Sequence, residues 1–149
     1  MRRLLLAVIC LCQPAAAYAD WSYVQWGMTQ QQVIAASRGN ARAIDEDDRR
    51  YGWAIAETTV KEGEWTFDVQ MSGYRVSGFS VKDFPVKISN IRFGVKTNCE
   101  ALLPYLRKKY KLLSEGSGGD TRFIDGTDEI RYHPFNSTCS FRRFKRGAF

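Results

Sequence analysis

Histidine is almost absent from this 149-residue chain, which contains His133 alone. A zinc site needs three or four side-chain ligands, and histidine catalysis needs an orienting carboxylate and a nucleophile that the sequence does not place nearby. The carboxylate pairs Glu62/Glu64 and Asp128/Glu129 fall at predicted turns. The sequence therefore predicts no catalytic residue, no metal site and no cofactor. A small periplasmic hydrolase that acts on envelope polymers through unidentified carboxylates is the alternative.

Long hydrophobic runs are missing too. The apolar stretch from Leu4 to Cys12 has nine residues, too few to cross a bilayer core about 30 Å thick. It follows Arg2 and Arg3 and precedes a small-x-small cleavage pattern, Ala17-Tyr18-Ala19. We therefore expect residues 1–19 to be a signal peptide and residues 20–149 to form one domain. That domain would be periplasmic or secreted, with no transmembrane segment.

Cysteine is scarce once the signal peptide is removed. Cys10 and Cys12 are lost with it, which leaves Cys99 and Cys139 in a compartment where thiols oxidise. Neither has a histidine beside it in sequence, as a catalytic thiol would want. The pair is therefore predicted to form a disulfide, and closing a loop of about 40 residues would be worth roughly 4 kcal/mol in the chain-entropy model.

The mature chain lacks an excess of acidic residues. Its 20 basic and 16 acidic side chains give a net charge of +4. All of this excess falls in residues 99–149, which hold ten basic and six acidic residues. One interpretation is solubility. The other is attraction to an anionic surface, either lipid, lipopolysaccharide or an acidic envelope protein. An exported chain does not meet nucleic acid in bulk, so nucleic acid is not expected as a partner.

Two groups of side chains are candidates for a binding surface. Aromatic residues crowd the mature N-terminus, and aromatic side chains often anchor interfaces. The alternative is that they pack against a sheet edge. Cations gather near the C-terminus, where the alternative is a last strand with a charged outer face. The candidates are Trp21, Tyr23, Trp26, Arg142, Arg143, Lys145 and Arg146.

Two helix starts are visible. Thr29 and Gln32 form a capping box that predicts a helix over residues 30–38. A second box, Thr97 to Glu100, opens a helix whose apolar stripe extends to Leu113, with a kink expected at Pro104. Residues 41–50 are polar and predict a loop.

Alternation of apolar and polar residues predicts the strands. Asp125-Gly126 is typical of a hairpin turn between two of them. The expected strands cover about residues 51–55, 65–72, 74–77 with 79–82, 91–96, 121–124, 129–133 and 139–145.

These elements indicate an α+β fold, an antiparallel sheet with two helices packed on one face. Trp26-Gly27-Met28-Thr29-x-x-Gln32 and Phe93-Gly94-Val95-Lys96-Thr97-x-x-Glu100 look alike. The likeness arises either by chance or because a helix-plus-strands unit was duplicated, with halves at 20–92 and 93–149.

The first of these motifs, Trp26 to Val33 followed by Gly39, carries a resemblance. It is similar to the opening of an exported helix-plus-strands family, which includes the small lipoprotein of the outer-membrane β-barrel assembly machinery and the β-lactamase inhibitory protein. The match covers about 14 residues of the mature chain. This chain has no lipid-attachment cysteine, and its second motif lacks the Met-Thr pair. The resemblance implies an exported, non-catalytic protein-binding domain and carries over no binding residue. The sequence thus favours a non-enzymatic binding or accessory protein of the cell envelope.

Overall fold

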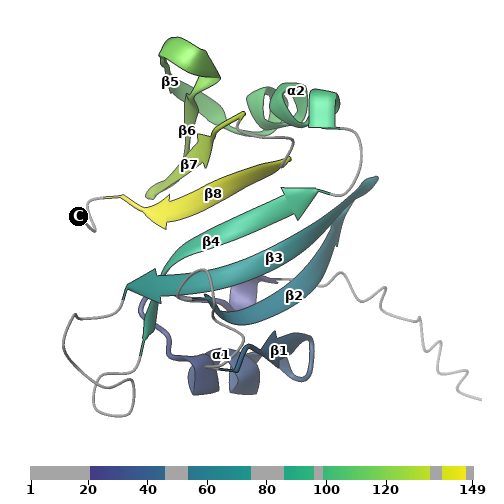
Figure 1. The fold of residues 1–149 in the computed structure, drawn as a ribbon, viewed down its shortest axis with the longest axis vertical. Helices are drawn as coiled ribbons and strands as arrows, with labels where there is room; N and C mark the ends of the chain where they lie inside the picture. The colour runs from purple at the N-terminus through teal and green to yellow at the C-terminus, as the bar shows by residue number, and fades with distance from the viewer. Residues whose placement is uncertain (1–20, 46–53, 75–85, 96–98, 135–138, 147–149) are drawn as a thin grey trace, which may run out of the picture.

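The computed structural model describes residues 21–45, 54–74, 86–95, 99–134 and 139–146. These residues form an α+β fold with an eight-stranded antiparallel sheet, which confirms the predicted fold class (Figure 1). The expected signal peptide and the expected strands at 74–77 and 79–82 lie outside the described residues, apart from Tyr74. Within the described ranges, neither helix has the length and apolar character that a membrane crossing demands.

The elements follow one another in a simple order. They are η1 (Trp21–Tyr23), α1 (Gln30–Ser37), β1 (Ala41–Ala43), β2 (Ala54–Glu62), β3 (Trp65–Tyr74), β4 (Lys87–Val95), α2 (Cys99–Lys109), β5 (Lys111–Glu115), η3 (Ser117–Gly119), β6 (Thr121–Asp125), β7 (Asp128–Tyr132) and β8 (Ser140–Lys145).

The sheet consists of two similar units. Its strand order is β1-β2-β3-β4-β8-β7-β6-β5, so a helix followed by four consecutive antiparallel strands occurs twice. The last strands of the two units, β4 and β8, pair in the middle of the sheet (Figure 1). β4 (Lys87–Val95) runs through residues 92/93, where the sequence analysis placed the boundary between the halves. Duplication stays a prediction.

The first helix follows its sequence signals closely. The Thr29 hydroxyl accepts the Gln32 backbone N–H, and the Gln32 side chain accepts the Thr29 N–H, so the capping box is confirmed. The helix ends where Arg38 adopts a left-handed conformation at φ 51°. Gly39 follows at φ 88°, a conformation that glycine adopts at little cost.

Two local predictions are wrong. The helix over Cys99–Lys109 does not continue to Leu113, because Lys111–Glu115 instead pairs with β6 as an edge strand. The polar segment at 41–50 begins with β1, since Ala41–Ala43 pairs with β2. In both cases pairing with a neighbouring strand overrides the local pattern.

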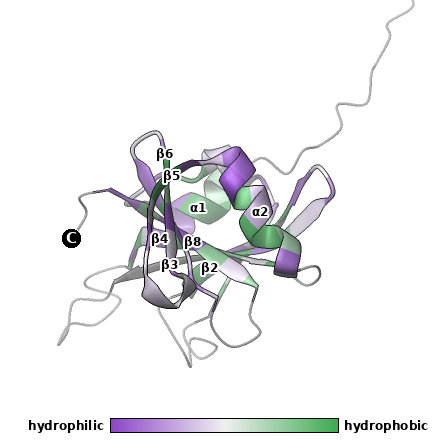
Figure 2. Cartoon of the chain, turned by 90° about the horizontal axis from the view of Figure 1, so that it is seen from above, coloured by the Kyte–Doolittle hydropathy of each residue, from purple (hydrophilic) through white to green (hydrophobic). Residues whose placement is uncertain are grey.

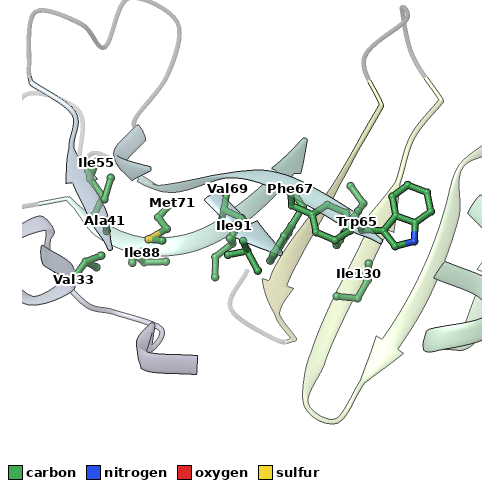
Figure 3. Packing of buried hydrophobic residues seen from close by; sticks show 14 of the residues in the cluster. Val33, Ala41, Ile55, Trp65, Phe67, Val69, Met71, Ile88, Ile91 and Ile130 are labelled. Carbon is green, nitrogen blue, oxygen red and sulfur yellow. The ribbon is translucent and has the colours of Figure 1, made fainter. Parts of the chain in front are cut away.

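One hydrophobic core joins both helices to the same face of the sheet, here the inner face. Val33 of α1 and Leu102 and Leu106 of α2 are fully buried in it. Figure 2 shows hydrophobic stretches on both helices. Figure 3 shows the buried side chains running from Val33 along β3 to Trp65.

The predicted disulfide is present and lies within the second unit. It joins Cys99, the first residue of α2, to Cys139, just before β8, with a Cα–Cα distance of 5.1 Å. The Val95 backbone N–H also donates to the Cys139 carbonyl at 2.7 Å. The bridge therefore fixes the start of α2 beside the central strand pair.

A polar contact ties α2 to the β2–β3 hairpin. The Lys109 ammonium donates to Glu62 at 2.5 Å and to the Tyr105 hydroxyl at 3.1 Å. Burial raises the pKa of Tyr105 to about 12, although the Lys109 hydrogen bond acts in the opposite direction. Burial alone would lower the pKa of Lys109, but the hydrogen bond to Glu62 and the neighbouring tyrosines raise it overall.

Candidate functional site

Four arginines stand in one line across the sheet. Arg92 of β4 is the register partner of Arg142 of β8, Arg142 is the partner of Arg131 of β7, and Arg131 is the partner of Arg122 of β6. These four residues are called the arginine row below. The four strands that carry them lie side by side in Figure 1.

The arginine row lies on the outer face of the sheet, opposite the helices. Phe93 and Phe141 are register partners and are buried in the core of the inner face. Successive residues of a strand point to opposite faces, so Arg92 and Arg142 belong to the outer face. Within the described part of the chain no helix covers that face. Arg122 and Arg142 are exposed, and Arg92 and Arg131 are half-buried.

Charge compensation along the row is uneven. Arg131 Nε lies 2.6 Å from Glu129 Oε1, and Arg122 Nε lies 3.9 Å from the same oxygen. The Arg131 guanidinium also stacks 4.8 Å from the ring centroid of Phe144. At the other end, Arg92 and Arg142 make no ion pair with any described residue. Like charges directly opposite each other destabilise a sheet, so folding alone does not favour this arrangement.

Two hollows meet on the outer face. One, of about 450 Å³, is lined by the arginine row together with Ser140 and Phe144. The other, of about 920 Å³, is lined by Arg92, Glu57 and Asp68. Arg92 lines both, so the hollows adjoin at the centre of the sheet. Glu57 accepts two hydrogen bonds from Arg42, at 2.9 and 2.6 Å.

The single histidine lies at the rim of the smaller hollow. His133 follows β7, and its Nδ1 contacts Oδ1 of Asp120. Ser140 lines the same hollow, but its hydroxyl makes no hydrogen bond with His133 or any other described residue. A serine nucleophile requires a base within hydrogen-bond reach. The orienting carboxylate is thus in place, and the activated nucleophile is not.

The predicted basic tail is divided between the two faces. Arg142 points outward in the arginine row, whereas Arg143 points inward and is only 14% exposed. Arg143 Nε donates to Asp128 at 2.7 Å and its Nη1 lies 3.0 Å from Asp125. Lys145 and Arg146 are exposed at the end of β8. These four residues therefore do not form one patch.

Two of the three predicted aromatic candidates, Tyr23 and Trp26, pack into the fold. Trp26 lies against the core and donates its indole N–H to Asp128 at 3.0 Å. Tyr23 packs against the same core, and burial raises its pKa. Trp21 belongs to η1. Trp26 therefore connects the N-terminal segment to β7 of the second unit, which is not an edge strand.

Among the described residues no group of three or more His, Cys, Asp or Glu side chains could hold a metal ion.

Three members of the arginine row were missed from the sequence. Arg92, Arg122 and Arg131 each sit at a polar position of an alternating strand, which is the only local signal they give. Their alignment depends on the register of four strands from two units. No family model, curated protein or solved structure matches this chain.

Proposed function

We propose that this chain is an exported, non-enzymatic binding module of the cell envelope that holds an acidic partner protein on its outer face. The observation that carries the proposal is the arginine row, four cations aligned at the same register across neighbouring strands. Arginine presents a planar donor fork that matches carboxylates. Two of the four, Arg92 and Arg142, lack an ion-pair partner among the described residues.

The surroundings of the row favour a protein over an anionic membrane. A bilayer surface is flat, whereas this face contains two adjoining hollows. Glu57, Asp68, Asp120 and Glu129 lie around the row, and each would be repelled by a uniformly anionic surface. A partner protein can place acids against the arginines only. Export is supported by the Cys99–Cys139 disulfide, because such bridges persist in oxidising compartments.

The test compares two variants that remove the same charge. Arg92→Gln/Arg142→Gln should weaken binding of the mature chain to immobilised poly-L-glutamate by about tenfold at low salt, with binding that falls as salt rises. The control, Lys108→Gln/Lys111→Gln, changes exposed cations on and after α2 and should bind like the parent. An equal loss of poly-L-glutamate binding in both variants would show that only net charge matters, and it would refute the proposal.

Vesicles containing an anionic phospholipid distinguish the two kinds of partner. The parent chain should bind poly-L-glutamate at salt concentrations where it no longer binds vesicles. If binding to vesicles instead persisted at higher salt than binding to poly-L-glutamate, the partner would be a lipid or lipopolysaccharide surface and not an acidic protein.

Export has its own test. Mass spectrometry of native material should find a chain that begins at Asp20, with no free thiol at Cys99 or Cys139. An intact Met1 end, or free thiols at both cysteines, would place the protein in the cytoplasm and remove the envelope setting.

A second candidate function is hydrolysis of an ester, favoured by the His133–Asp120 contact at the rim of an arginine-lined hollow. A hydrolase of this kind would use Ser140 as nucleophile and His133 as base. A fluorophosphonate probe should then label the parent chain and leave His133→Gln and Ser140→Ala unlabelled. If the probe does not label the parent chain, the hydrolase candidate is refuted, and the proposal of a binding module is not affected.

A further inference from the structure

The spacing of the arginine row defines which acidic structure can occupy it. Neighbouring strands lie about 4.8 Å apart, so the four positions from Arg92 to Arg122 span about 14 Å. The row runs across the strands. An occupant that uses all four arginines needs four acidic groups spaced at about 4.8 Å along its own axis.

An α-helix meets this requirement. With 3.6 residues per turn and a rise of about 1.5 Å per residue, positions i, i+3, i+7 and i+10 share one side and span about 15 Å. An extended strand does not meet it. Its same-face residues repeat about every 6.8 Å, so four acids would span about 20 Å and leave the ends of the row unpaired.

The shape of the outer face also suits a helix. The two hollows share Arg92 in their lining, one over the second unit and the other over the first. An extended peptide gains affinity mainly by backbone hydrogen bonds to a strand edge. The row lies on strands whose edges are already paired on both sides, so those backbone bonds are not available to it.

From these observations we propose that the occupant of the arginine row is an α-helix of a partner protein, laid across β4, β8, β7 and β6, with acidic side chains at i, i+3, i+7 and i+10. This inference rests on the proposed function and names the structure of its partner. Beyond Arg92 the same register continues with Gln70 and then Glu57. Gln70 is neutral and Glu57 is acidic, so the partner helix should carry acidic side chains only where it crosses the arginine row.

The test uses three alanine-rich peptides with four glutamates each. The first places them at i, i+3, i+7 and i+10, and the second spreads them round the helix at i, i+2, i+5 and i+10. The third keeps the first pattern but carries a proline between the central glutamates, which breaks the helix. Fluorescence anisotropy with the full mature chain should show at least about tenfold tighter binding of the first peptide than of the other two.

The protein variants complete the experiment. Arg92→Gln/Arg142→Gln should abolish the preference for the patterned peptide, and Lys108→Gln/Lys111→Gln should retain it. Circular dichroism of each variant checks that the fold is intact. Equal affinity for the three peptides would overturn the helical occupant. Binding to flexible poly-L-glutamate would then still stand, so failure of this inference is distinguishable from failure of the proposed function.

Discussion

Replacing Asp128 by asparagine tests the polar contact that joins the N-terminal segment to the second unit. The Asp128 side chain is 10% exposed and lies 2.7 Å from Nε of Arg143, which is itself 14% exposed. It also accepts the Trp26 indole N–H at 3.0 Å. Asparagine keeps the shape and one acceptor oxygen but removes the charge, so a buried guanidinium loses its closest counter-charge.

The expected cost is about 3 kcal/mol. Breaking a buried ion pair by neutralising one partner costs roughly 3–5 kcal/mol, and Asp125 retains part of the Arg143 interaction at 3.0 Å. For a domain of about 130 residues, an unfolding entropy of about 2.1 cal/mol/K per residue converts 3 kcal/mol into a fall of about 11 °C in Tm.

Urea unfolding of the oxidised mature chain, followed by tryptophan fluorescence, measures the effect. The matched control is Asp125→Asn, because Asp125 is 42% exposed and contacts the same guanidinium. That change should cost less than about 1 kcal/mol. A loss at Asp128 no larger than the loss at Asp125 would mean that this contact does not hold the two units together.

Three further changes have defined outcomes. Arg142→Thr removes two like-charge cross-strand pairs and should raise the free energy of unfolding, measured in urea, by about 0.5–1 kcal/mol; a decrease would contradict it. Gly73→Ala places a Cβ 1.9 Å from the Lys87 carbonyl oxygen and should cost about 2 kcal/mol or more, whereas Gly94→Ala, with 3.6 Å to the nearest atom, should be near neutral. Tyr105, with a pKa of about 12, keeps its proton longer in the folded than in the unfolded chain. Stability should therefore fall as pH rises from about 10 towards 12, and Tyr105→Phe should remove the last tyrosinate absorbance step.

Features with a complete local cause were predictable from the sequence. The Thr29 capping box contains both of its partners within four residues, and the structure shows both bonds. The hairpin at Asp125-Gly126 was also found, because its turn residues and its two strands are adjacent in the chain. The disulfide followed from the cysteine count and the expected compartment.

Features that depend on a distant strand were not predictable. The edge strand β5 looked helical because Leu113 extended the stripe of α2, yet Leu113 is 44% exposed and its neighbour Leu112 is 48% exposed. The arginine row needs the register of four strands drawn from two units. One feature of the site could have been predicted from the sequence. Because side chains alternate along a strand, Arg142 and Arg143 must point to opposite faces of the sheet.

Arg142 and Arg143, which are adjacent in β8, support the proposal that a partner binds on the outer face. On the inner face, the Arg143 charge is matched by Asp128 and Asp125 at 2.7 and 3.0 Å, as burial requires. On the outer face, Arg142 stands directly between Arg92 and Arg131, with no described carboxylate paired to it. A neutral polar residue at position 142 would make the sheet more stable, because it would remove the repulsion from Arg92 and Arg131 and still be polar. The arginine row is therefore unfavourable for folding alone. Carboxylates of the proposed acidic partner would offset this repulsion.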